Sequence, residues 1–138
     1  MKLNNEERQL VIENRLRRAN ETLEEAKDLL NLSRWHGAAN RLYYACYYAV
    51  TALLIQSGHS AHTHGGVIGL FGKYFVLTNI FSKEDNKLYQ KLFELRQDGD
   101  YSDWISIEES DILPLFEPAE KLIETIENTI NSRKLLEA

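Results

Sequence analysis

The sequence predicts an all-α protein, an antiparallel up-and-down helical bundle of four to five helices. Apolar residues recur at steps of three and four along most of its 138 residues, which is the period of a helix with one buried face. No segment shows the convincing apolar–polar alternation of a half-buried strand. Connections between the helical segments are short, as in antiparallel bundles. We therefore expect one domain over residues 1–138, with its core at about residues 5–132.

Two long helices open the chain. The second helix, at about residues 35–56, is apolar around most of its circumference, which predicts a place at the centre of the bundle. Its Cys46 is the one cysteine of the chain, so we expect a small core residue in a reducing compartment. The first helix, at about residues 5–31, carries a single apolar stripe formed by Ile12, Leu16, Ala19, Leu23, Ala26 and Leu30.

The middle of the chain predicts two further helices. The fourth helix is expected to start at Ser82, whose hydroxyl can cap it together with Asp85, and to reach Arg96. Gly99 then predicts a break or a kink. A brief third helix, weakened by nearby glycines, is indicated by Val67, Leu70, Phe71 and Tyr74.

The last helix is clear from Phe116 onward, but two starts are compatible with the sequence. Residues 106–109 fit a capping box, which predicts a kinked helix from Ser106. Pro114 and Pro118 each lack a backbone donor, which favours a separate turn and a helix that starts near Pro118. The tail at residues 133–138 is expected to fray.

Composition limits the classes of partner. The formal charge is −5, so the whole molecule lacks the basic footprint of a general nucleic-acid binder. Arg15, Arg17 and Arg18 are compatible with a local basic patch, although a solvated helix face is the better explanation of these three residues. The start of the chain is too polar for a signal peptide, and no apolar segment has the length of a membrane span. We therefore expect a cytoplasmic protein without a membrane partner.

The residues with the strongest chemical signal are Arg96, Asp98, Asp100 and Tyr101. Arg96 follows an apolar helix face and cannot lose its charge, so it must find an acid, a phosphate or water. One interpretation is an ion pair with Asp98 or Asp100. The other is a phosphate-binding or nucleotide-binding site, with Arg96 on the phosphate and Tyr101 donating from its hydroxyl.

The histidines give a weak signal for a metal. His59, His62 and His64 lie within six residues, but their spacing matches no helical ligand pair, and their loop holds no carboxylate and no cysteine. We therefore predict no metal and no cofactor. Loop solvation or helix capping explains these residues, and His36 is expected to be a partly buried start of the second helix.

Four tyrosines stand within six residues of the second helix, so they must point around most of its circumference. Tyr44 and Tyr48 share a face with Arg41. That face predicts packing against another helix or a second subunit, while a platform on which nucleotides stack is the alternative.

Together these segments resemble the HEPN superfamily, over about residues 16–130. The resemblance rests on residues 40–49, Ala52–Leu54, His64 through Phe71, Leu95–Arg96 and Asp100–Tyr101. It implies an antiparallel bundle that forms a homodimer, commonly with the two copies of the Arg motif brought together. It also implies a minimal nucleotidyltransferase as partner in a toxin–antitoxin pair, and metal-independent ribonuclease activity in active members.

The family's ribonuclease motif is Arg, a polar residue, a short spacer and His. Arg96 and Gln97 fit its beginning, but Tyr101 stands where a spacer of four would place the histidine. Because tyrosine has an ordinary pKa of about 10, this departure removes the residue best suited to proton transfer near neutral pH. His64 is the histidine that could approach in space.

Three functions follow as alternatives. The first is a dimeric module that binds RNA or a nucleotide and partners a nucleotidyltransferase. The second is a metal-independent endoribonuclease toxin with Arg96 and Tyr101 as catalytic residues, and the third is a structural dimer without a ligand. The predicted phosphate-binding or nucleotide-binding residues are Arg96, Asp100, Tyr101, Arg41, Tyr44 and His64.

Overall fold

The computed structural model describes residues 3–137, and their side chains through residue 134. It confirms the all-α prediction, because every regular element in this range is helical. The elements are α1 (Asn5–Asn31), α2 (Trp35–Gln56), α3 (His64–Phe71), the π-helical turn η1 (Gly72–Val76), α4 (Lys83–Tyr101) and α5 (Glu109–Glu137). None of the described helices is long and apolar enough to cross a membrane.

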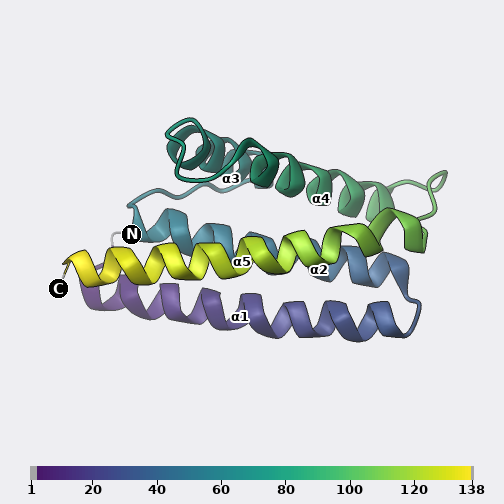
Figure 1. The fold of residues 1–138 in the computed structure, drawn as a ribbon, viewed down its shortest axis with the longest axis horizontal. Coiled ribbons are helices and arrows are strands. Elements are labelled where there is room, and N and C mark those ends of the chain that lie inside the picture. The colour runs from purple at the N-terminus through teal and green to yellow at the C-terminus, as the bar shows by residue number, and fades with distance from the viewer. Residues whose placement is uncertain (1–2, 138) are drawn as a thin grey trace.

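The four long helices run up and down in chain order. In Figure 1, α1 and α4 run in one direction, and α2 and α5 run in the other, while α3 lies at one end beside α4. As predicted, α2 is the central helix, since it packs against α1, α3, α4 and α5. The short α3 and η1 form a side element, which leaves an up-and-down bundle of four long helices.

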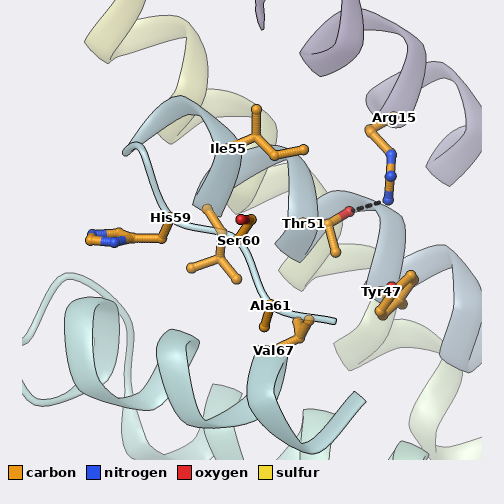
Figure 2. A pocket seen from close by; sticks show the side chains of 9 residues that line it. Arg15, Tyr47, Thr51, Ile55, His59, Ser60, Ala61 and Val67 are labelled. Carbon is orange, nitrogen blue, oxygen red and sulfur yellow. Dashed lines mark hydrogen bonds between the residues drawn. The ribbon is translucent and has the colours of Figure 1, made fainter. Parts of the chain in front are cut away.

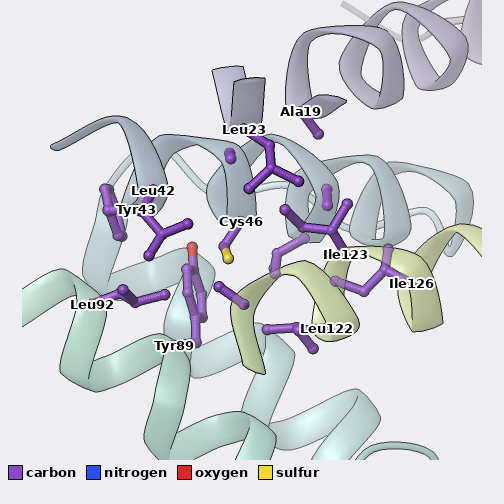
Figure 3. Packing of buried hydrophobic residues seen from close by; sticks show 14 of the residues in the cluster. Ala19, Leu23, Leu42, Tyr43, Cys46, Tyr89, Leu92, Leu122, Ile123 and Ile126 are labelled. Carbon is purple, nitrogen blue, oxygen red and sulfur yellow. The ribbon is translucent and has the colours of Figure 1, made fainter. Parts of the chain in front are cut away.

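The core forms where side chains from α1, α2, α4 and α5 meet (Figure 3). Most of α2 is buried, as its apolar composition predicts, and Leu42, Tyr43 and Cys46 have no exposed surface. Burial raises the pKa of the Cys46 thiol to about 12, so it stays protonated and acts as a small apolar residue. The cluster also contains Leu23 from α1 and Leu92 from α4.

The helix ends follow local hydrogen bonding. The predicted cap of α4 is confirmed, since the Ser82 hydroxyl accepts from the Asp85 N–H and the Asp85 carboxylate accepts from the Ser82 N–H. The third helix starts earlier than its apolar residues indicated. Thr63 caps it by accepting from the Gly66 N–H, which brings His64 into its first turn.

The start of α5 differs from both predictions. The helix begins at Glu109, and the Asp111 carboxylate accepts from the Glu108 N–H, so the cap lies two residues after Ser106. Pro114 and Pro118 lie inside the helix on its exposed face, where the carbonyls that lose their partners can reach water. α5 then continues through Glu137, and residue 138 lies outside the described range.

Gly99 does not break α4, which continues through Tyr101. A Cβ at this position would lie 2.5 Å from Cδ1 of the buried Ile107 and 3.3 Å from Nδ1 of His36. The glycine is therefore explained by close packing against the segment that leads to α5, and not by a left-handed backbone.

We expect Gly99→Ala to lower the free energy of unfolding by about 1 kcal/mol, because overpacking outweighs the gain in helix propensity. Gly69→Ala in α3 is the matched control, since nothing lies within 4 Å of its added Cβ. That control should be neutral or stabilising by up to about 1 kcal/mol. Urea unfolding measures both variants, and equal stabilisation by the two would contradict the packing explanation.

Candidate functional site

Arg96 occupies the last turns of α4 and is only 9% exposed. Its Nε lies 3.1 Å from Oδ2 of Asp100, one helical turn later. This contact is an ion pair and not an aligned hydrogen bond, because Nε has no hydrogen-bond partner of good geometry. On the other side of the guanidinium, Nη2 donates to the hydroxyl oxygens of Tyr44 at 3.0 Å and Tyr101 at 3.5 Å. The predicted pair with Asp100 is thus present, and Nη2 faces two phenols.

Aromatic rings surround the Arg96 guanidinium. Its central carbon lies 5.2 Å from the ring centre of Tyr44, 5.4 Å from that of Tyr101 and 5.7 Å from that of Tyr43. Each ring face is negative and stabilises a cation that has lost part of its water shell. The charge of Arg96 is therefore held by one carboxylate and three rings.

A chain of polar contacts continues from Asp100 to α2. Asn40 Nδ2 donates to Asp100 Oδ2 at 2.9 Å, and Asn40 Oδ1 accepts from Nε and Nη2 of Arg41 at 3.0 and 2.7 Å. Arg41 also lies 5.3 Å from the ring centre of Tyr44 and 3.9 Å from the carboxylate of Glu25. Asn40 was not among the predicted site residues. Its signal in the sequence was a polar side chain on a largely apolar helix.

His64 reaches the same cluster from the first turn of α3. Its Nδ1 lies 2.6 Å from the Tyr43 hydroxyl, and its ring centre lies 4.9 Å from that of Tyr47 and 5.9 Å from that of Tyr44. Burial lowers the pKa of His64, and the positive charge of Arg96 lowers it further.

Burial raises the pKa of Tyr43 above its ordinary value, so the phenol keeps its proton. We therefore assign the Tyr43 hydroxyl as donor to Nδ1 of a neutral His64. In that tautomer the second ring nitrogen of His64 carries hydrogen and can donate.

The structure brings together all six residues that the sequence singled out. They come from α2, α3 and α4, and they are Arg41, Tyr44, His64, Arg96, Asp100 and Tyr101. Tyr101 is the most open of the hydroxyl-bearing members, at 72% exposed. Beyond it, Trp104 is 95% exposed and Ile105 is also exposed, so aromatic and apolar surface adjoins the site.

The other histidines make contacts outside this cluster. The His59 ring stacks on Tyr74 at 3.9 Å, and His62 is exposed. The prediction of a partly buried His36 is wrong, because its side chain lies outside the core, where Nε2 accepts from the Ile107 N–H at 3.3 Å. Among the residues with described placement, no three histidine, cysteine or acidic side chains form a group that could hold a metal ion.

The HEPN domain family matches residues 12–129, which is most of the chain. The chain belongs to the HEPN family. A protein of Thermotoga maritima named "UPF0332 protein" is 41% identical over 128 residues, which cover 93% of this chain and 97% of that relative. A chain of Methanocaldococcus jannaschii named "Putative toxin" is 30% identical over 100 residues, which cover 72% of this chain and 68% of its own.

A solved structure agrees with this HEPN assignment at the level of the fold. The crystal structure of TT1696 from Thermus thermophilus matches with a TM-score of 0.72, covering 85% of this chain and 96% of its own. Its sequence identity is 16%, so the likeness concerns the arrangement of helices alone.

The lowered pKa of His64 makes the stability of this HEPN domain depend on pH. The unfolded chain takes up a proton at this residue near pH 6.5, whereas the folded chain does so only at lower pH. The free energy of unfolding should therefore fall as the pH drops below about 6.5. His64→Gln should weaken this dependence.

Urea unfolding at several pH values between about 5 and 7.5 tests this expectation. His62→Gln is the control for loss of an imidazole from the same loop region, at an exposed position. The expectation fails if the wild type and His64→Gln lose stability equally as the pH falls.

Proposed function

We propose that this HEPN protein is a dimeric module that binds a phosphate group of RNA or of a nucleotide through the Arg96 cluster. The observation that carries the proposal is the pair of contacts from Arg96 Nη2 to the hydroxyls of Tyr44 and Tyr101. The arginine and the exposed phenol together offer donors at one edge of the domain. These are the groups that recognise phosphate oxygens.

Asp100 does not exclude this function, because it approaches Arg96 from the Nε side. The contact to Tyr101 is the longer of the two on Nη2, at 3.5 Å, and Tyr101 is mostly exposed. A phosphate oxygen can therefore enter between Nη2 and the Tyr101 hydroxyl with little rearrangement. The tyrosine would then donate to the phosphate instead of accepting from the arginine.

Aromatic surface beside the cluster favours a nucleotide or single-stranded RNA as the source of that phosphate. The Tyr101 ring is 72% exposed, and bases stack on such rings without strong sequence preference. The chain carries a formal charge of −5, so binding depends on local contacts, and its salt dependence should be shallow because Arg96 neutralises a single phosphate.

A metal-independent ribonuclease is the second candidate, and the position of His64 favours it. Its imidazole lies in the same aromatic cluster as Arg96. It could therefore take the role of the motif histidine, whose position in this sequence is occupied by Tyr101. Arg96 would stabilise charge that develops on the phosphate. The bond from Tyr43 to Nδ1 makes the free nitrogen a donor, which suits binding an oxygen better than accepting a proton.

The partner belongs to the proposal as well. The resemblance to paired HEPN proteins and the name "Putative toxin" of a relative support a toxin–antitoxin-like pair with a minimal nucleotidyltransferase. The exposed side chains of Trp104 and Ile105 support an interface next to the Arg96 cluster, because contact with a second subunit would remove this surface from water.

A labelled single-stranded RNA oligonucleotide in EDTA tests the phosphate site. Arg96→Gln should weaken binding at least about tenfold, because it removes a charge-assisted contact worth about 1.5–3 kcal/mol. Tyr101→Phe keeps the ring at an exposed position, so the fold should be unaffected. It should weaken binding by about 2–10-fold, the effect of losing one neutral hydrogen bond.

Arg34→Gln removes the same charge from an exposed position outside the cluster and serves as the matched control. Equal binding by Arg96→Gln and the wild type, or equal losses in Arg96→Gln and Arg34→Gln, would contradict the site. A denaturing gel of the same reactions separates the two functions. Intact RNA supports the binding module, whereas products that disappear in both Arg96→Gln and His64→Gln support the ribonuclease.

Light scattering tests the assembly. The particle in solution should have twice the 16.0 kDa mass of one chain. Trp104→Glu should shift it toward a monomer if the exposed loop that contains Trp104 forms the interface. Co-expression with a nucleotidyltransferase encoded next to the gene should give a heavier particle that contains both proteins. A wild-type particle of 16.0 kDa at low concentration would contradict the dimer.

A further inference from the structure

A separate cavity of about 90 Å³ opens between α1, α2 and the start of α3 (Figure 2). A volume of this size holds several water molecules, and so also a group as small as a phosphate. Tyr47 belongs to its wall and also packs on His64, so the cavity adjoins the aromatic cluster of the candidate site. The lining residues are Arg15, Tyr47, Thr51, Leu54, Ile55, His59, Ser60, Ala61 and Val67.

Arg15 gives this cavity its charge. Its Nη1 donates to Oγ1 of Thr51 at 3.1 Å, and the Thr51 hydroxyl donates to the carbonyl of Tyr48 at 2.9 Å. Thr51 is only 7% exposed, so it holds the guanidinium at the cavity without neutralising it. None of the lining residues is acidic, and no ion pair among the described residues includes Arg15. By contrast, Arg17 in the same helix pairs with Glu21.

The remaining walls combine neutral donors with apolar surface. In Figure 2, the Ser60 hydroxyl, Tyr47 and Arg15 lie around the cavity in three different directions, while the His59 ring turns away from Arg15. The apolar side chains of Ile55, Ala61 and Val67 also line it. Apolar walls reduce competition from water and strengthen the attraction of Arg15 for an anion.

From this arrangement we infer that the Arg15 cavity is a second anion site that binds a phosphoryl group. A guanidinium binds two oxygens of such a group side by side, and donors from other directions suit its tetrahedral shape. The site does not depend on the Arg96 cluster. It can take free inorganic phosphate or the phosphate of a nucleotide, and Tyr47 lies between this cavity and the aromatic cluster of the candidate site.

Amide NMR of the full chain tests the inference, with inorganic phosphate, AMP and a diadenosine dinucleotide as separate probes. Each of the three probes should shift the amide resonances of Thr51, Ser60 and Ala61. Arg15→Gln should weaken binding about tenfold or more, whereas Arg17→Gln on the same helix should stay within about twofold of the wild type. Ser60→Ala lies at an exposed position and should weaken binding without affecting the fold.

The probes also identify the source of the phosphate. Equal affinity for inorganic phosphate and AMP supports a site for the phosphoryl group alone. Tighter binding of the dinucleotide, lost in part in Arg96→Gln, supports a ligand that spans both sites. Shifts at Ser60 that persist in Arg96→Gln support the cavity even if RNA binding at the Arg96 cluster fails.

The inference is overturned if no probe shifts Thr51, Ser60 or Ala61 at millimolar concentration. Equal weakening by Arg15→Gln and Arg17→Gln would also overturn it, because that result would reflect the general charge of α1. Thermal unfolding of each variant, followed by circular dichroism, shows whether the fold is retained.

Discussion

The candidate site depends on keeping the charge of Arg96 at a place that is almost closed to water. A guanidinium does not deprotonate in proteins, so its lost hydration must be offset by fixed groups. Asp100 offsets it from one side and the rings of Tyr43, Tyr44 and Tyr101 from the others. These groups come from α2 and α4, so the contact between the two helices is a condition for the site.

The two sides of α2 make this contact possible. Ala38, Ala45 and Ala52 lie on one side of the helix and permit close packing in the core. Asn40 and Tyr44 lie one helical turn apart on another face of α2 and meet the end of α4. One helix therefore supplies both the centre of the bundle and half of the candidate site.

The two arginine sites differ in how their charge is balanced. Arg96 has a carboxylate neighbour and aromatic contacts, which fix its position but reduce its net attraction for an anion. Arg15 has the buried Thr51 hydroxyl as its acceptor, at a cavity without acidic residues. Tyr47 lies between them, against His64 on one side and the cavity on the other.

Much of the molecule could be read from local pattern alone. The helical period determined α1, α2 and the central place of α2, and the Ser82 cap determined the start of α4, because these features depend on neighbouring residues. Gly99 and the start of α5 could not be read in this way. The close approach of Ile107 and His36 explains the glycine, and Asp111, not the predicted Ser106, supplies the cap at Glu108.

The sequence by itself determined an all-α bundle, because helical periodicity is a property of the chain, and the resemblance of its motifs to the HEPN superfamily indicated the six candidate residues. Only the tertiary structure decided that His64 lies against Tyr43, that Asn40 links Asp100 to Arg41, and that Arg15 faces a cavity. The contacts of His64 with Tyr43 and of Asn40 with Asp100 join different helices, and the cavity lies between helices, so all three arise from packing that no local pattern encodes.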